Sequence, residues 1–178
     1  MPLANRPRRS PQTIRAAPES TLLAAEIESL GQEQLLARAD DIEVCIAPAH
    51  LIPTVLQEIG RLRELTFRAA GEGTGKAVDL DHFDSAYLHL FAWNATKNEV
   101  VGAYRLAGTD QTRDLYTATL FKYGDAFLSR IGPALKEDSL RCWPFGRESE
   151  HISHAILDTA FCSALSASAT NIKPCRGS

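Results

Sequence analysis

The sequence has no long apolar run. Nothing in it approaches the roughly 18 consecutive apolar residues of a membrane-spanning helix, and the N-terminus lacks the apolar core of a signal peptide. These absences predict a cytoplasmic protein. Cysteine is scarce as well, at 4 of 178 residues with no C-x-x-C pair, which argues against a zinc knuckle or a redox pair and predicts free thiols. The net charge of -3 argues against a nucleic-acid-binding surface across the whole protein.

Length and composition predict one domain preceded by a basic leader. At 178 residues, 44% hydrophobic and 23% charged, the chain is long enough to bury one core and too short for two full domains. Residues 1–19 hold four prolines and four arginines without apolar periodicity, which predicts a flexible leader. The domain itself is expected over residues 20–137, and residues 138–178 form a tail of different composition.

Apolar periodicity predicts two helices. The first covers residues 20–30 and presents one apolar face made of Leu22, Leu23, Ile27 and Leu30. The second covers residues 52–68, with Pro53 in the first turn, where proline is accepted. Arg63 lies in line with apolar residues four positions to either side, Ile59 and Phe67. An arginine on such a face indicates a pocket or a buried partner.

Alternating β-rich segments predict a strand over residues 42–47 and a hairpin over residues 86–93 and 99–107, joined by "NATKN". If Trp93 pairs with Glu99, His89 lies opposite Ala103. This register puts Arg105 on one face with Tyr87, His89 and Phe91. The acidic segment "DLDHFD" enters the same end of the hairpin, so Asp84 is expected within reach of Arg105.

The stretch "RAAGEGTGK" can be compared with two kinds of phosphate-binding loop. As a P-loop it fails twice, because the glycine spacing is one residue short and Lys76 is followed by Ala77. It also contains R-x-x-G-x-G, the form of the pyrophosphate loop in GNAT acetyltransferases, but that loop leaves a strand and opens a helix. Here the stretch follows a predicted helix. We therefore predict a mobile glycine-rich flap beside a site, with Lys76 as its cation.

Three carboxylates, Asp79, Asp81 and Asp84, form the main candidate constellation together with Arg63 and Arg105. Carboxylates so close together repel one another unless they share cations. A solvated acidic turn is the simpler interpretation. Two arginines predicted on inward faces favour instead a cluster in which the carboxylates pair with these arginines, since an unpaired buried guanidinium is costly.

The histidines give weaker signals. His89 on the strand face is either a base or a satisfied core histidine. "HISHAILD" offers His151, His154 and Asp158, but a metal site needs further ligands, and the H-x-x-x-x-D pair of glycerolipid acyltransferases needs one more residue between His154 and Asp158. No nucleophile elbow, zinc motif or Rossmann fingerprint is present, and no metal is expected.

The motif order resembles that of a known family. Arg63-x-x-x-Phe67, Asp81-x-x-Asp84 and Gly102-x-Tyr104-Arg105-Leu106 follow one another within "EIGRLRELTFRAAGEGTGKAVDLDHFDSAYLHLFAWN" and "EVVGAYRLAGTD". With "LYTATLFKYGDAFL" they resemble the GNAT-like N-acyltransferase domain of bacterial hemolysin-like proteins. That domain is related to ornithine lipid-forming N-acyltransferases and, more distantly, to acyl-homoserine lactone synthases.

The resemblance implies a fold, a reaction and roles for single residues. The fold would be α/β of GNAT type, a twisted mixed sheet flanked by helices. The reaction would move a fatty acyl group from a thioester, on acyl carrier protein or CoA, to a small amine in lipid metabolism, without a permanently bound cofactor. The expected catalytic residues are Asp81, Asp84 and Arg105, and the expected substrate-binding residues are Arg63, Phe67, Tyr104 and Lys76.

The resemblance also implies partners and a place in the cell. Acyl carrier protein and a small amine acceptor would be the partners, and nucleic acid would not be one. A basic leader would suit peripheral contact with anionic lipid at the inner membrane.

After "GPALKEDSL" the sequence departs from the family pattern. A Glu-Leu-Gly-Arg-like motif is expected there, but the chain continues with a short Ser/Ala-rich tail that suggests one helix around residues 152–165. We therefore expect a domain incomplete at its C-terminus, with residues 102–106 near an unprotected sheet edge. The alternatives are a non-catalytic truncated or frame-shifted fragment that folds only partly or with a partner, and a metal- or nucleotide-binding module built on "GEGTGK" and "DLDHFD".

Overall fold

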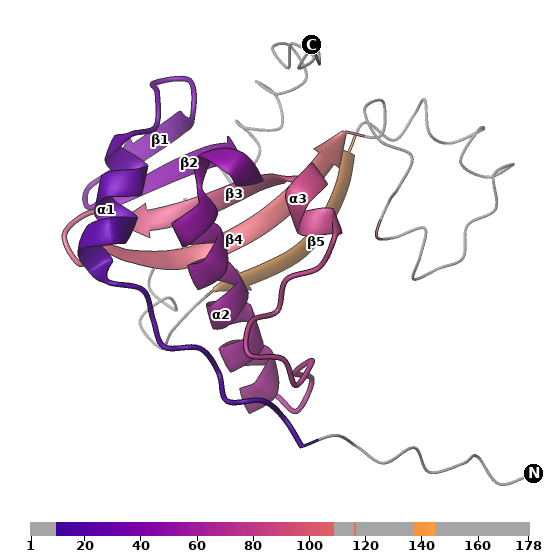
Figure 1. Ribbon diagram of the computed structural model, residues 1–178. Coiled ribbons are helices and arrows are strands. Elements are labelled where there is room, and N and C mark those ends of the chain that lie inside the picture. Colours follow the sequence, from indigo (N-terminus) through magenta and orange to yellow (C-terminus); the bar gives the residue numbers. More distant parts are fainter. Residues whose placement is uncertain (1–9, 109–115, 117–136, 145–178) are drawn as a thin grey trace, which may run out of the picture.

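The computed structural model describes residues 10–108, 116 and 137–144 of the protein. The described elements follow one another along the chain as three α-helices, one short 3-10 helix and five strands (Figure 1). Their bounds are α1 Ser20–Glu28, β1 Leu35–Ala39, β2 Ile42–Pro48, η1 Ala49–Leu51, α2 Pro53–Ala69, α3 Phe83–Ala86, β3 Leu88–Asn94, β4 Glu99–Gly108 and β5 Glu137–Pro144.

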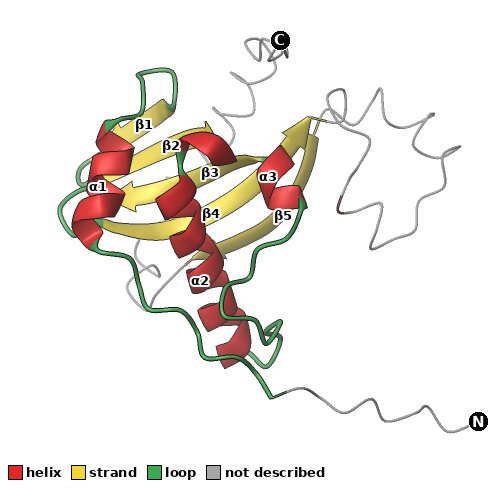
Figure 2. Ribbon diagram, in the orientation of Figure 1, coloured by secondary structure: helices red, strands yellow, loops and turns green. Residues whose placement is uncertain are grey.

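The five strands form one sheet in the order β1-β2-β3-β4-β5, so each described strand pairs with its neighbour in sequence. All four pairings are antiparallel, and the parallel pairing that a mixed sheet also contains does not occur among the described strands. Helices α1, α2 and α3 lie over one face of the sheet, with α2 crossing it obliquely (Figures 1 and 2). The predicted α/β architecture of a sheet with helices is confirmed.

The core lies between this helical layer and the sheet. Helix α1 contributes Leu23 and Ile27, α2 contributes Val55 and Ile59, and Ile52 lies directly before α2. The strands contribute Cys45, Ala47, Phe91, Trp93, Val100 and Ala103. In α1 the buried pair is spaced i, i+4, as a helix with one apolar stripe requires. Leu22, expected on that stripe, is instead 55% exposed, because a residue adjacent to Leu23 is turned about 100° away on a helix.

Helix α2 is the predicted second helix, and Pro53 occupies its first turn. The backbone N–H groups of Thr54 and Val55 donate to the Glu26 carboxylate of α1 at 2.8–3.2 Å. These are two of the N–H groups that a helix start leaves without an intrahelical partner, so α1 supplies the cap that α2 lacks locally. No described helix combines the length and the apolar character needed to cross a bilayer.

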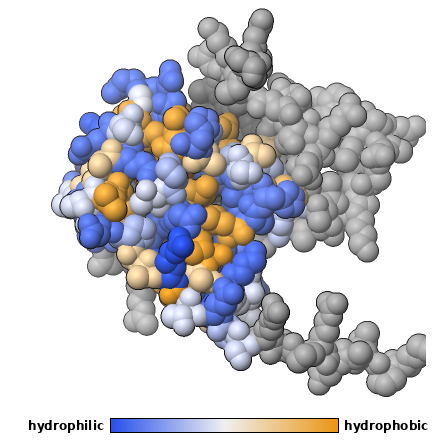
Figure 3. Space-filling model, viewed as in Figure 1, coloured by the Kyte–Doolittle hydropathy of each residue, from blue (hydrophilic) through white to orange (hydrophobic). Residues whose placement is uncertain are grey.

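The opposite face of the sheet is apolar too. Val44, Leu90 and Leu106 are buried there, against Leu36, Ala37, Ile46, Leu88 and Tyr104. The helix-covered face of the molecule is mostly hydrophilic, with apolar patches between polar side chains (Figure 3). Among the described residues, the exposed large apolar side chains are Leu22, Leu51 and Leu65.

The β3–β4 hairpin forms, but its register differs from the predicted one. Asn94, and not Trp93, pairs with Glu99, which shifts the register by one residue. An irregularity between Ala92 and Trp93 shifts it by one more, so His89 lies opposite Arg105 instead of Ala103. The Asn94 side chain fixes the turn by accepting the N–H groups of Thr96 and Lys97. The total shift is two residues. Because side chains alternate with period two along a strand, Arg105 keeps the face that the sequence predicted.

Strand β5 corrects the expectation of an open edge. It pairs with β4 from Gly102 to Gly108, so the edge at residues 102–106 is covered. The first part of the expected tail, residues 138–144, is thus a strand of the sheet. The expected helix around residues 152–165, with His151, His154 and Asp158, lies outside the described residues.

Candidate active site

The charged residues singled out in the sequence meet at the α3 end of the sheet (Figure 1). Helix α2 contributes Arg63, the loop after it contributes Asp79 and Asp81, α3 contributes Asp84, and β4 contributes Arg105. Four of these side chains are buried, and Asp81 is part-exposed. Three carboxylates face two guanidiniums, which leaves one negative charge in excess.

Arg63 and Asp84 form a buried two-pronged ion pair. The Arg63 Nη1 and Nη2 atoms donate to Asp84 Oδ1 and Oδ2 at 2.9 and 3.0 Å. Nη2 also donates to the Asp79 carbonyl oxygen, and Nε lies 3.6 Å from Asp79 Oδ2. The arginine predicted to point inward from α2 therefore clamps α3 and the acidic loop onto the helix, as planar guanidinium–carboxylate geometry allows.

Arg105 contacts Asp81 and shares Asp84 with Arg63. Its Nη1 lies 2.7 Å from Asp81 Oδ1 and 3.2 Å from Asp84 Oδ1, which confirms the predicted approach of Asp84 to Arg105. Three aromatic rings surround the guanidinium, with its Cζ atom 4.8–5.6 Å from the ring centroids of Phe83, Tyr87 and Tyr116. The rings shield the cation from water while their faces attract it. This cage was not predicted from the sequence, apart from the position of Tyr87 on the same face as Arg105.

Asp81 and Asp84 differ in what they can do. The Asp84 side chain is 3% exposed, whereas that of Asp81 is 30% exposed. Asp84 Oδ2 accepts the backbone N–H of Asp81 at 2.8 Å, and Asp81 Oδ1 accepts the N–H of Phe83 at 3.0 Å. Asp84 is therefore enclosed by donors of the protein, and Asp81 is the carboxylate that a small molecule can reach.

The protonation states of the buried groups follow from these contacts. Burial alone would raise the pKa of Asp84, but the hydrogen bonds and charge of Arg63, the Asp81 N–H and the charge of Arg105 outweigh it and lower that pKa. Burial alone would lower the pKa of Arg105, but Asp81 and Asp84 raise it. The pair is thus held in its ionised form.

His89 lies beneath this cluster on β3 and is 1% exposed. Its Nε2 atom is 2.8 Å from the backbone carbonyl oxygen of Asp84. Of the two interpretations left open by the sequence, the hydrogen-bonded core histidine is the one that the structure supports. The imidazole is shielded from solvent at this position.

The glycine-rich stretch owes its phosphate-loop appearance to an internal anion. Glu64 of α2 is fully buried, and its carboxylate accepts the N–H of Thr74, the Thr74 hydroxyl and the N–H of Gly75 at 2.5–2.9 Å. Arg68 donates to the same carboxylate at 2.8–3.0 Å. Where the sequence predicts a mobile flap, the structure shows a loop wrapped around this carboxylate. Glu64 was missed, although its i, i+4 spacing from Arg68 was readable.

Residues 10–19 lie along this loop (Figure 2). The N–H groups of Gln12 and Arg15 donate to the carbonyl oxygens of Gly75 and Ala77 at 2.8 and 3.0 Å. Arg68 ties both segments together by donating to the carbonyl oxygens of Gln12 and Lys76. Part of the leader that the sequence predicts as flexible is thus hydrogen-bonded to the loop.

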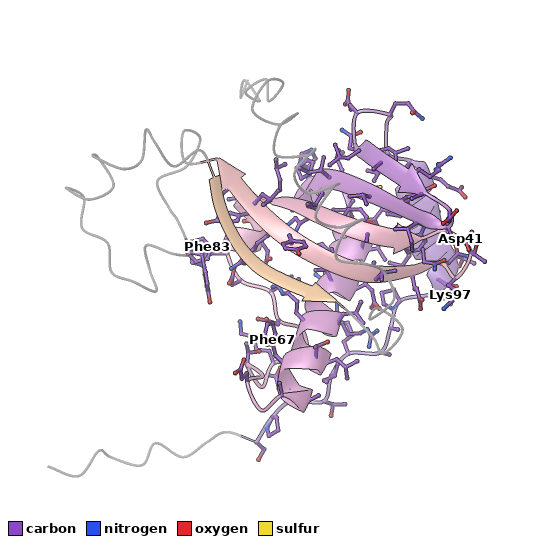
Figure 4. The ribbon with its side chains drawn as sticks, turned by 180° about the vertical axis from the view of Figure 1, so that it is seen from behind. Asp41, Phe67, Phe83 and Lys97 are labelled. Atoms are coloured by element: carbon purple, nitrogen blue, oxygen red, sulfur yellow. The ribbon has the colours of Figure 1, made fainter. Side chains whose placement is uncertain are left out.

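The remaining predicted site residues are distributed unevenly. Phe67 is buried one helical turn beyond Arg63, on the same side of α2 (Figure 4). The Lys76 ammonium donates to the carbonyl oxygen of Leu80 at 3.1 Å, directly before Asp81. Tyr104 does not join the cluster, because it faces the opposite side of the sheet from Arg105 and packs with Leu90 and its neighbours.

Within the described residues, no group of three or more His, Cys, Asp or Glu side chains is arranged to hold a metal ion. The aspartates of "DLDHFD" are engaged by arginines, and the amides of residues 74 and 75 by Glu64. These contacts count against the metal- or nucleotide-binding hypothesis.

The chain is similar to known acyltransferases over part of its length. Residues 62–141 match the family model of the acetyltransferase (GNAT) domain. The chain is 37% identical over 122 residues to a glycine N(alpha)-acyltransferase of Bacteroides thetaiotaomicron, an alignment that covers 63% of this chain and 36% of the relative. A glycine N(alpha)-acyltransferase of Phocaeicola vulgatus is 44% identical over 91 residues, covering 46% of this chain and 28% of the relative.

The chain thus spans about a third of the length of the curated relatives that it matches. No solved structure matches it significantly. The family match runs from helix α2 through the acidic loop and the hairpin into β5, and so contains every residue of the charged cluster described above. The segment that holds the charged cluster is therefore similar to the GNAT acetyltransferase domain, and the chain is similar to two N-acyltransferases over part of their length.

Proposed function

We propose that this domain transfers an acyl group from an acyl thioester to the amino group of a small amino acid. Glycine is the first acceptor to test, since the similar proteins are named glycine N(alpha)-acyltransferases. The observation that carries the proposal is Asp81, a part-exposed carboxylate held by Arg105 and a backbone N–H at the edge of a net negative cluster. Such a group attracts an ammonium and binds it in one orientation.

The proposed reaction forms one bond and breaks one. The unprotonated acceptor nitrogen attacks the thioester carbonyl carbon, so that the C–N bond forms and the C–S bond breaks. The nitrogen loses a proton, and the thiolate that leaves takes up a proton to become the free thiol. Asp81 accepts a hydrogen bond from the nitrogen and helps to take up its proton. Since the thioester supplies a good leaving group, positioning accounts for much of the rate.

The neighbouring residues keep Asp81 in place. Asp84 fixes the Asp81 backbone N–H and is itself clamped by Arg63, so both act through Asp81. Arg105 donates to the Asp81 carboxylate directly and fixes its orientation. Phe67, buried on the same side of α2, is proposed to exclude water from the acyl group.

Lys76 is proposed to bind the carboxylate of the acceptor. The Lys76 ammonium donates to the carbonyl oxygen of the peptide group that joins Leu80 to Asp81. The N–H of the same peptide group donates to Asp84. An amino acid bound between Lys76 and Asp81 would have both of its charges matched. We expect Lys76→Gln to raise KM for glycine with little change in KM for the acyl donor. Lys97→Gln, in the β3–β4 turn at the far end of the sheet, is the matched control (Figure 4).

The donor we propose is a long-chain acyl group on acyl carrier protein, with acyl-CoA as the alternative, and the product would enter lipid metabolism. Peripheral contact of the basic leader with anionic lipid at the inner membrane belongs to the same proposal. Binding of the full chain to vesicles with and without anionic lipid tests that part separately.

The proposal is tested by release of thiol from the acyl thioester. The full chain is offered acyl carrier protein or CoA carrying the same acyl group, together with glycine or with glycolate, which has a hydroxyl in place of the amine. Thiol release that requires glycine and does not occur with glycolate supports amine acylation. Release that is equal with both, or absent with both donors, counts against the proposal and favours a non-catalytic domain.

A further inference from the structure

His89 is a buried titratable group that the proposed reaction does not use directly. A carbonyl oxygen can only accept a hydrogen bond, so the Nε2 atom that lies 2.8 Å from the Asp84 carbonyl must carry a proton. In the neutral ring the proton is therefore on Nε2. The contact joins the start of β3 to α3, and the ring is 1% exposed.

The surroundings of His89 oppose a positive charge on the ring. Arg105 lies directly opposite on β4 and Ala47 directly opposite on β2, while α2 brings Arg63 and α3 brings Asp84. Burial lowers the pKa of His89; the carbonyl and charge of Asp84 oppose this, and both arginines add to it, with a net lowering. A protonated imidazole would be a third buried cation beside the buried carboxylates of Asp79 and Asp84, which already face Arg63 and Arg105.

The hydrogen bond from His89 reaches Asp81 through two further contacts. It holds the backbone of Asp84, whose carboxylate accepts the Asp81 N–H at 2.8 Å and ion-pairs with Arg63 and Arg105. The Asp81 carbonyl in turn accepts the Asp84 N–H at 3.2 Å. The turn formed by residues 81–84 is thus tied to the sheet by His89 from below and to the two arginines from the side.

We propose that His89 is a positioning residue for acyl transfer: its Nε2–H holds the turn that carries Asp81, and a proton added at Nδ1 places a third buried cation beside Arg63 and Arg105, which loosens that turn and limits activity in acid. The inference rests on the proposed function, because it assigns Asp81 a role in the reaction. Its structural part, that protonation of His89 loosens the fold, stands apart from catalysis and can be measured without substrate.

Two substitutions separate the hydrogen bond from the charge. His89→Gln places an amide N–H near the position of Nε2 but does not titrate, and His89→Leu removes the donor. His50→Gln, at an exposed histidine of η1, is the control for a histidine-to-glutamine change. All four proteins are compared from about pH 8 to about pH 5, the range in which histidine changes charge.

The expected kinetic result is a ratio that changes with pH. The ratio of kcat/KM for wild type to that for His89→Gln should fall as the pH falls, because ionisation of the acceptor amine affects both proteins equally and cancels. His89→Leu should lower kcat about tenfold at the upper end of the range, as loss of a buried hydrogen bond of roughly 1.4 kcal/mol would, with KM for the donor unchanged. A constant ratio, or an unchanged kcat in His89→Leu, would overturn the proposal.

Melting temperatures give the independent readout. Wild type and His50→Gln should lose melting temperature relative to His89→Gln as the pH falls below about 6.5, because the unfolded chain binds a proton that the folded chain resists. If wild type transfers no acyl group, the proposed function fails, and this comparison alone decides the structural part. Parallel melting curves for wild type and His89→Gln would then refute it.

Discussion

Asp84→Asn should unfold the protein at much lower denaturant concentration than its small change in shape suggests. The substitution keeps the size of the side chain but removes the charge that two buried guanidiniums share, those of Arg63 at 2.9 and 3.0 Å and of Arg105 at 3.2 Å. The substitution also turns an amide nitrogen, itself a donor, toward one of the groups that donate a hydrogen bond to Asp84. Removing one partner of a buried ion pair costs about 3–5 kcal/mol, because the other charge stays buried and uncompensated.

The assay is urea unfolding of the full chain, followed by circular dichroism and extrapolated to water. Asp41→Asn is the matched control, since Asp41 is exposed at the opposite end of the sheet from Phe83 (Figure 4), and we expect a change within about 0.5 kcal/mol. The double variant Arg63→Met, Asp84→Leu should be less destabilised than the sum of its two single changes, because no charge of that pair is left unpaired. A loss of under about 1 kcal/mol for Asp84→Asn would refute the reasoning, since that is the range of solvated surface pairs.

Three further predictions concern acid stability and the loop. Because the folded pKa of Asp84 is lowered, its stabilising contribution is present above the unfolded pKa of about 3.9 and is lost as the pH falls through the folded pKa, so melting temperature should drop more steeply below about pH 4 in wild type than in Asp84→Asn. Gly60→Ala should destabilise by about 1–3 kcal/mol in urea despite a better helix propensity, because the added Cβ would lie 2.7 Å from Leu80 Cγ; a stabilised variant would contradict this. Glu64→Gln should speed amide hydrogen exchange at residues 74 and 75, which donate to that carboxylate, and unchanged exchange would show that the loop is held by other contacts.

Features with a strong local period were predictable from the sequence. The inward direction of Arg63 followed from its place between two apolar residues four positions away, and it is buried as expected. The face of Arg105 was also correct, although the register was wrong by two residues. An even shift leaves the alternation of a strand unchanged. The predicted approach of Arg105 to Asp84 was therefore confirmed, although the turn is one residue shorter than predicted and the irregularity between Ala92 and Trp93 was not foreseen.

Features that depend on tertiary contacts were missed. Strand β1 reads LLARA, whose leucines and alanines favour a helix, and it becomes a strand by pairing with β2. The loop at residues 71–77 looked free because its glycines permit many conformations, but the buried Glu64 carboxylate selects one. Strand β5 was predicted to be part of a tail, because its sequence departs from the family pattern. Its pairing with β4 could not be predicted from the sequence.

The central claim is that Asp81 takes part in transfer of an acyl group to an amine. The most direct test is mass-spectrometric measurement of the N-acyl product formed by the full chain from an acyl thioester and isotope-labelled glycine. We expect product with wild type and with Asp41→Asn, and at least about tenfold less with Asp81→Asn, within the range that a lost acid–base or positioning group produces. Equal product from Asp81→Asn and wild type would contradict the claim.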